Sequence, residues 1–150
     1  MSPHIPAGCV VVLLKRTNSQ GRILVNIALW IIAGLLAAVF LAGGVVKLIQ
    51  SKEKLAASGL GFVEDVSAGA VKAIGAVEIL GAVGLILPAV LDIVPVLVPL
   101  AAVGLVLLMA GAFITHVRRR EAQGIVVTLI LLALAVLVAW GRFGPQSFSS

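Results

Sequence analysis

The run from Ile23 to Val46, ILVNIALWIIAGLLAAVFLAGGVV, decides the fold of this protein. Asn26 is its one strongly polar residue, and Lys47 follows directly after it. A helix needs roughly 20 apolar residues to cross a hydrocarbon core of about 30 Å. The run is long enough, so we predict that it spans a membrane.

The composition of the whole chain favours the same interpretation. Of its 150 residues, 61% are hydrophobic and 11% are charged, and the mean hydropathy is +1.23. Ordinary globular proteins contain about 25% charged residues. A chain with less than half that share lacks the charged surface of a water-soluble protein, so we expect a single-domain integral membrane protein.

Three further apolar runs follow, at about residues 68–91, 93–115 and 122–140. We expect Ser67 to cap the start of the second run and Asp92 the start of the third. No run alternates between polar and apolar residues as a membrane β-strand does. The predicted fold is therefore all-α, a four-transmembrane-helix bundle over residues 23–145, with a flexible N-terminal tail at 1–22 and a C-terminal tail at 146–150.

The basic residues predict the orientation of this bundle. Seven of them accompany the loops 47–67 and 116–121, whereas four lie at the opposite face. By the positive-inside rule, both loops are cytoplasmic, both termini are outside, and the protein is a multi-pass protein of the cell inner membrane. The residues expected to anchor it at the membrane surfaces are Lys72, Arg118, Arg119, Arg120, Trp140 and Arg142.

Small residues are expected to bring the helices together, because lipid supplies no hydrophobic force between them. In the second run, glycines recur with Glu78 at steps of three, which places Glu78 on a face of small side chains. The first and third runs supply matching surfaces. The predicted packing glycines are Gly43, Gly44, Gly75, Gly81, Gly84, Gly104 and Gly111.

Glu78 is the one acidic residue inside a predicted span. A charge at the centre of a span costs about 2.5 to 3.5 kcal/mol on insertion scales, so such groups generally face the bundle interior and find partners there. The candidate partners are Lys47, which closes the first helix, and His116, which closes the third. The three residues form either a structural clasp between helices or a proton-active or ligand-binding site.

The loop from Gln50 to Ser67 is the one sizeable connection between the runs. Gly59 and Gly61 interrupt it, and Phe62 and Val63 could enter the membrane interface. It is either a short amphipathic segment lying on the membrane or a lid over a site between the helices.

Catalytic groups are scarce. The chain has one cysteine and two histidines, His4 and His116, which argues against a disulfide, a bis-histidine haem and a zinc site. No Gly-rich phosphate loop or nucleophile elbow occurs, so the catalytic residues are unknown and no cofactor is evident, although a quinone is possible. The net charge of +5 is spread over loop ends and predicts no nucleic-acid binding.

Several stretches together resemble the DoxX-like family of small bacterial membrane proteins. They are IALWIIAGLLAAVFLAGGVVKL, EKLAASGLGFVEDVS, IGAVEILGAVGLILP, PLAAVGLVLLMAGAFITHVRR and AWGRFGP, and they cover roughly residues 26–145 in order. The resemblance implies a four-helix membrane protein and a link to quinone-dependent redox complexes. The polar positions typical of the family fall on Lys47, Glu78 and His116.

Three functional hypotheses remain open. The first is a non-enzymatic accessory or assembly subunit that works with other membrane subunits or as a homo-oligomer in the lipid bilayer. The second is a quinone-linked redox component that binds a quinone headgroup near Glu78. The third and weakest is a transporter of small molecules or lipids.

Overall fold

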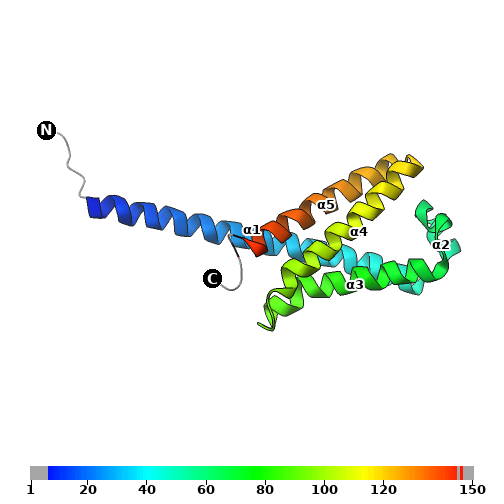
Figure 1. Cartoon of the computed structure of the whole chain (residues 1–150), viewed down its shortest axis with the longest axis horizontal. Coiled ribbons are helices and arrows are strands. Elements are labelled where there is room, and N and C mark those ends of the chain that lie inside the picture. The colour runs from blue at the N-terminus through cyan, green and yellow to red at the C-terminus, as the bar shows by residue number, and fades with distance from the viewer. Residues whose placement is uncertain (1–6, 145, 147–150) are drawn as a thin grey trace.

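The fold consists of helices alone in the part of the chain that the structure describes. The computed structural model describes the backbone of residues 7–144 and 146, and the side chains from Asn18 onward. Four of the helices are long and apolar enough to cross a membrane, which confirms the predicted four-helix membrane bundle. In chain order the elements are α1 (Ala7–Ile49), α2 (Lys52–Ala57), the 3-10 helix η1 (Gly61–Asp65), α3 (Ala68–Val90), α4 (Leu97–Arg119) and α5 (Ala122–Phe143) (Figure 1).

Helix α1 is longer than the sequence predicted. We expected a flexible tail over residues 1–22, but the helix already begins at Ala7 and its first half projects beyond the bundle (Figure 1). No proline occurs between Pro6 and Pro88, so nothing in this stretch forces a break. Residues 1–6 lie outside the described part, and of the predicted C-terminal tail only Gln146 lies within it.

The start of α4 also differs from the prediction. We expected a helix from residue 93 with Asp92 as its cap, but α4 begins at Leu97 and no side chain caps it. Asp92 and Val94 both have positive φ angles, 52° and 48°. Pro95 disfavours helical geometry in the residue before it, so the chain turns here before the helix starts. By contrast, the Ser67 hydroxyl accepts a hydrogen bond of 3.2 Å from the Ala70 amide and caps α3 as predicted.

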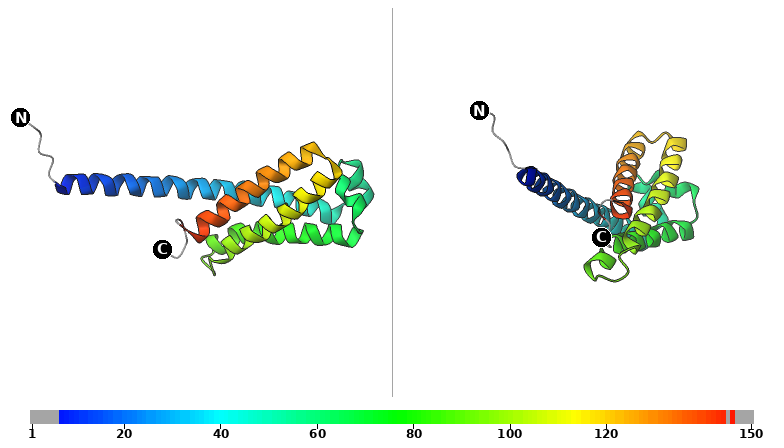
Figure 2. Two further views of the ribbon diagram at one scale, coloured as in Figure 1. Left: turned by 45° about the horizontal axis from the view of Figure 1, so that its top comes forward. Right: turned by 60° about the vertical axis from the view of Figure 1, so that its left-hand side comes forward.

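The four long helices form two pairs, α1 with α3 and α4 with α5 (Figure 2). The pairs touch where α5 ends and diverge towards α2 (Figure 1). We call the first region, around Leu29, Leu85 and Val138, the packed end. We call the other region, around Lys47 and Glu78, the cavity end.

Glycines set how closely the helices approach. Within the first pair, a Cβ added at Gly44 would lie 2.6 Å from the Gly75 carbonyl oxygen. Between the pairs, a Cβ at Gly84 would lie 2.8 Å from the Ala101 Cβ. Contacts this short leave no room for a side chain, so these glycines allow the backbones to meet.

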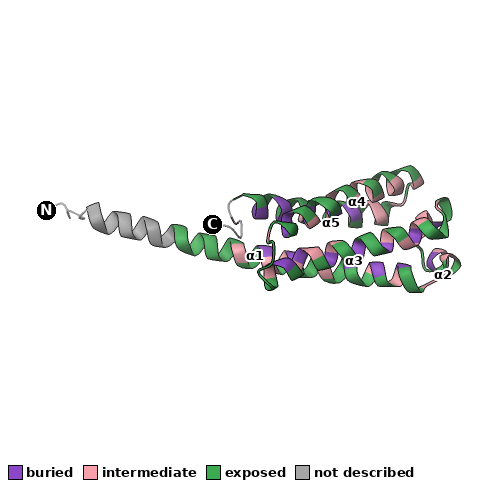
Figure 3. Cartoon of the chain, turned by 60° about the horizontal axis from the view of Figure 1, so that its bottom comes forward, coloured by how far each residue is buried: buried purple, intermediate pink, exposed green. Residues whose placement is uncertain are grey.

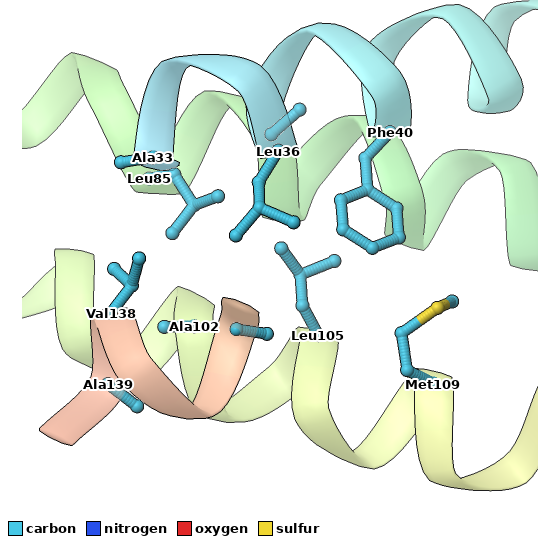
Figure 4. Packing of buried hydrophobic residues seen from close by; sticks show 11 residues of the cluster. Ala33, Leu36, Phe40, Leu85, Ala102, Leu105, Met109, Val138 and Ala139 are labelled. Atoms are coloured by element: carbon cyan, nitrogen blue, oxygen red, sulfur yellow. The ribbon is translucent and has the colours of Figure 1, made fainter. Parts of the chain in front are cut away.

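The apolar core fills the packed end and joins all four long helices (Figure 4). Leu36 and Phe40 of α1 face Leu105 and Met109 of α4 across this core. Its buried members are Ala33, Leu36, Phe40, Ala82, Leu85, Ala102, Leu105, Met109, Ala135, Val138 and Ala139.

The outer surface of the bundle is apolar as well. Figure 3 shows that exposed residues cover the outer faces of all four long helices. Large apolar side chains are mostly exposed there, for example Leu80 at 70% and Leu107 at 69%. Such a surface suits lipid and not water, so the protein is embedded in the lipid bilayer.

Candidate functional site

A cavity of about 530 Å³ occupies the cavity end, between the two diverging helix pairs. Phe40 and Met109, which belong to the apolar core, form its inner limit. Its other apolar walls come from all four long helices and from the loop between α1 and α3. The polar side chains in the lining are Lys47, Glu78, Thr115, His116 and Thr128.

Lys47 and Glu78 form a buried ion pair in this cavity. The Lys47 Nζ donates hydrogen bonds to both carboxylate oxygens of Glu78, at 3.0 and 2.8 Å. The two residues are only 9% and 5% exposed. They meet because Gly44 and Gly75 bring α1 and α3 together one helical turn away. The pair thus carries no net charge and joins α1 to α3.

His116 lines the same cavity but does not bond to this pair. Its Nδ1 lies 2.6 Å from the Oε2 of Glu121. Its ring lies against Gly124, where an added Cβ would approach Nδ1 to less than van der Waals distance, and the Phe62 ring meets it edge-on with the centroids 6.3 Å apart. The expected three-residue clasp is therefore wrong in one respect: His116 stays on the α4–α5 side and partners Glu121.

The loop between α1 and α3 covers the end of the cavity. It folds into α2 and η1, and we call residues 50–67 the cap segment (Figure 1). Leu55 and Val63 of this segment are completely buried with Val71 of α3 in a second apolar cluster. Leu60, Phe62 and Val66 line the cavity. This segment is thus packed against the bundle, and of the two predicted alternatives its placement favours the lid.

Arg119 joins the cap segment to the α4–α5 turn. Its guanidinium donates to Asp65 at 2.5 Å, to Glu64 at 3.2 Å and to Glu121 at 2.6 Å. We expected Arg118, Arg119 and Arg120 alike to set topology and touch lipid. Arg119 instead lies in an ion-pair network, because the turn after α4 directs it towards η1.

The same turn brings Glu121 back towards α4. Arg120 has a φ of 58°, and the Glu121 amide donates to the His116 carbonyl oxygen at 3.0 Å. This is a helix end of the Schellman type, with arginine where glycine is common. The Glu121 carboxylate accepts hydrogen bonds from Arg119 and from His116, and these hold the pKa of Glu121 below its usual range.

Two other predicted anchors have partners within the protein. The Lys72 Nζ donates to the carbonyl oxygens of Leu48 and Gln50, at the C-terminal end of α1, where a cation is favoured. Arg142 is 3% exposed, donates to the Asn26 Oδ1 at 2.7 Å and lies 5.4 Å from the centre of the Trp30 ring. Both side chains thus bond within the protein, and their role as membrane anchors stays a prediction.

Trp140, the remaining predicted anchor, is 65% exposed on α5. Its indole faces the surroundings of the bundle, as an interfacial anchor would. It therefore differs from its close neighbour Arg142, with which we had grouped it.

The predicted packing glycines fall into two groups. A Cβ at Gly44, Gly75, Gly81 or Gly84 would collide with a neighbouring helix, and one at Gly43 would touch Glu78 and Lys47 at 3.4 and 3.5 Å. At Gly104 and Gly111 an added Cβ would meet nothing within 4 Å. These two α4 glycines therefore pack no helix among the described residues, because both lie on an exposed face of α4.

Glu64, Asp65, Glu121 and Thr128 were missed by the sequence analysis. Three of them are acidic residues in short connections, where charge is ordinary and carries no signal of its own. The Thr128 hydroxyl donates to the Gly124 carbonyl oxygen at 2.7 Å and so presents little free polarity to the cavity.

The site combines hydrogen-bonding groups with a large apolar volume. Within the described residues, no group of three or more His, Cys, Asp and Glu side chains is arranged to hold a metal ion. Lys47 and Glu78 can bind a polar group by hydrogen bonds, and the apolar walls can enclose the body attached to it.

Comparison with known proteins adds one match. Residues 31–138 match the family model described as the DoxX-like family, a range that includes Lys47, Glu78 and His116. No curated protein and no solved structure matches the chain.

Proposed function

This chain belongs to the DoxX-like family and is an integral membrane protein, and we propose that it binds the neutral polar headgroup of a quinone-class lipid in its cavity. The Lys47–Glu78 pair, buried in an apolar cavity at membrane depth, is the observation that carries this proposal. In this role the protein holds and orients the ligand, and electrons come from or go to another component of the membrane.

The charge of the pair favours a neutral ligand. Glu78 already neutralises Lys47 and receives two of its N–H donors. A charged headgroup would have to displace one partner and leave the other as an uncompensated buried charge, which costs several kcal/mol. A neutral group can instead use the remaining N–H of Lys47 and the free lone pairs of the Glu78 carboxylate.

A quinone headgroup has the matching chemistry. Its carbonyl oxygens accept hydrogen bonds, as from Lys47, and the hydroxyls of its reduced form donate them, as to Glu78. A volume of about 530 Å³ falls within the range of roughly 300–1,000 Å³ usual for small-molecule sites. Leu108, Met109 and Leu131 supply apolar walls for the ring and the start of its tail.

Equilibrium binding of a short-chain benzoquinone to the protein in lipid nanodiscs tests the proposal. The variant Lys47→Met/Glu78→Leu removes both charges together and avoids an unpaired one. Loss of a hydrogen bond to a charged group costs about 1.5–3 kcal/mol, so we expect binding to weaken about 10- to 100-fold.

Lys54→Met/Glu53→Leu is the matched control, because it removes an exposed pair of charges from the cap segment. This control should bind like the wild type. Equal affinity in the Lys47→Met/Glu78→Leu variant, or no binding by the wild type to any quinone, contradicts the proposal.

A role as an accessory subunit is a second candidate, favoured by the projecting half of α1. Helix α1 has 43 residues and a length of about 64 Å, roughly twice the hydrocarbon thickness. This arm offers a contact for another subunit. Native mass spectrometry of protein extracted gently from its host membranes should show a partner that is lost on deletion of residues 1–17; a lone monomer in both cases contradicts this role.

A further inference from the structure

We propose that the cavity takes up its ligand sideways from the bilayer, past Gly111, while the latched cap segment closes it to water. This inference rests on the proposed function and specifies the ligand class further. The ligand is a membrane-dissolved amphiphile whose headgroup can leave the water interface, and not a water-soluble metabolite.

The cap segment closes the cavity on its aqueous side. Leu60, Phe62 and Val66 extend from the cap segment into the lining. The segment is fixed to the α1–α3 pair by Leu55 and Val63, which are completely buried. This half of the closure is therefore apolar and held by buried side chains, and Gly59 is the exposed residue that it contributes to the lining.

The other half of the closure is a polar latch across to the α4–α5 pair. It consists of Arg119 with Glu64 and Asp65 of η1, at 3.2 and 2.5 Å. Gly61 lies directly against this latch, since a Cβ there would come within 2.7 Å of the Arg119 Nη2. Ion pairs at the surface are weak and sensitive to salt, so this half can open without disturbing the apolar anchor.

The side of the cavity has no such cover. Val39, Leu107 and Gly111 line the cavity and are also exposed on the outer surface of the spanning helices. A Cβ at Gly111 would meet nothing within 4 Å. The cavity therefore reaches the outer surface along α4, at a position where one small residue leaves space.

The depth of this opening places it among lipid tails. Gly111 lies eight residues before the end of α4 at Arg119, or about 12 Å along the helix. Glu78 lies ten residues after the start of α3 at Ala68, or about 15 Å along it. Measured from the ends of their helices, the polar pair and the opening thus lie at similar depth.

This depth discriminates between lipid classes. A phospholipid headgroup is charged and strongly hydrated, and bringing it about 12–15 Å below the surface carries the cost of burying a charge. A neutral quinone ring can reach the same depth, with its tail passing over Gly111 into the bilayer. The opening and the neutral ion pair therefore select the same kind of ligand.

The first experiment measures how fast a short-chain benzoquinone loads from vesicles into the reconstituted protein. Gly111→Leu should fill the side opening and slow loading about tenfold or more, because Leu adds a branched side chain where Gly has none. Gly34→Leu is the matched control, since an added Cβ at Gly34 also meets nothing within 4 Å and Gly34 is not part of the lining. Unchanged loading in Gly111→Leu overturns the side route.

The second experiment tests the closure without any ligand. Thr128→Cys in a Cys9→Ser background, which removes the one native cysteine, places a thiol in the lining. A charged water-soluble maleimide should label it slowly when the latch is intact and several-fold faster in Arg119→Gln. Arg118→Gln, which removes a neighbouring exposed arginine, should leave the rate unchanged. Rapid labelling with the latch intact overturns the closure.

The two experiments separate failure of this inference from failure of the proposed function. If the wild type loads no quinone but Thr128→Cys stays protected until Arg119 is changed, the quinone function is wrong and the closure to water is retained. If the wild type and Gly111→Leu load quinone equally fast, and Thr128→Cys is labelled rapidly with the latch intact, the quinone function is retained and the side route is wrong.

Discussion

The packed end and the cavity end are built from the same four helices but differ in what lies between them. At the packed end, small and apolar residues such as Gly84, Ala101 and Leu105 allow the two helix pairs to touch. At the cavity end, the ion pair between Lys47 and Glu78 joins α1 to α3. Arg119 of α4 is linked to these two helices through the cap segment. In this membrane protein, residue size decides where helices meet. The Lys47–Glu78 pair lies where the helix pairs separate, whereas the buried Arg142 joins α5 to α1 where they meet.

The largest change in stability is expected when one charge of the Lys47–Glu78 pair is left without its partner. Lys47→Met removes the cation from Glu78, which is 5% exposed, and should lower the free energy of unfolding by about 3–5 kcal/mol. Reversible unfolding in mixed micelles measures this value.

The double variant Lys47→Met/Glu78→Leu sharpens the same test. Replacing both members of a buried pair with apolar residues is often neutral or stabilising. We therefore expect most of the lost stability to return. If the double variant is as unstable as Lys47→Met, the ion pair itself is needed to fold the cavity end, which contradicts this expectation.

A smaller change in stability is expected when one glycine at each end is replaced by alanine. The sign of this change should differ between the two ends. Gly84→Ala would place a Cβ 2.8 Å from the Ala101 Cβ and should cost about 1–3 kcal/mol. Gly111→Ala meets nothing and should stabilise α4 by up to about 1 kcal/mol, because glycine is unfavourable inside a helix. Thermal unfolding of both variants should show shifts in opposite directions; a loss of stability at Gly111 would mean that this face of α4 packs against something else.

The smallest change in stability is expected on lowering the pH, and we expect it at the cavity end, where Glu121 lies. The pKa of Glu121 is lowered in the folded protein by Arg119 and His116, so its carboxylate stabilises the fold above the ordinary glutamate pKa. This contribution should be lost as the pH falls through the lowered value. In unfolding measured from pH 7 downward, Glu121→Gln should be less acid-sensitive than the wild type. Asp92→Asn, at a residue with no ion pair among those described, should follow the wild type.

The spans were predictable from the sequence because the bilayer imposes a strict length and polarity on them. The predicted span 68–91 agrees with α3 at Ala68–Val90. The beginning of α1 was not predictable in this way, because hydropathy shows where a helix leaves lipid and not where it ends. The start of α4 was misjudged because a possible cap at Asp92 was given more weight than the effect of Pro95 on the residue before it.

Of the candidate site, only the part that follows from burying a charge in an apolar span was predictable from the sequence. Glu78 needed a buried cation, and Lys47 lay at the right depth to provide it. His116 was equally well placed by depth, but its partner depends on a turn with a non-glycine residue at positive φ, which the letters RRRE do not reveal. Arg119 could not be distinguished from Arg118 and Arg120 for the same reason, since only the direction of that turn selects it.

The unbroken course of α1 has a practical consequence for experimental structure determination. A chain of 15.4 kDa buried in a micelle has too little mass outside it to align single particles reliably in electron microscopy. A soluble domain joined in continuous helical register before α1 would follow the orientation of the bundle, because one uninterrupted helix runs from Ala7 to Lys47 at the cavity end. The projecting half of α1 (Figure 1) is therefore the natural place for a fiducial marker.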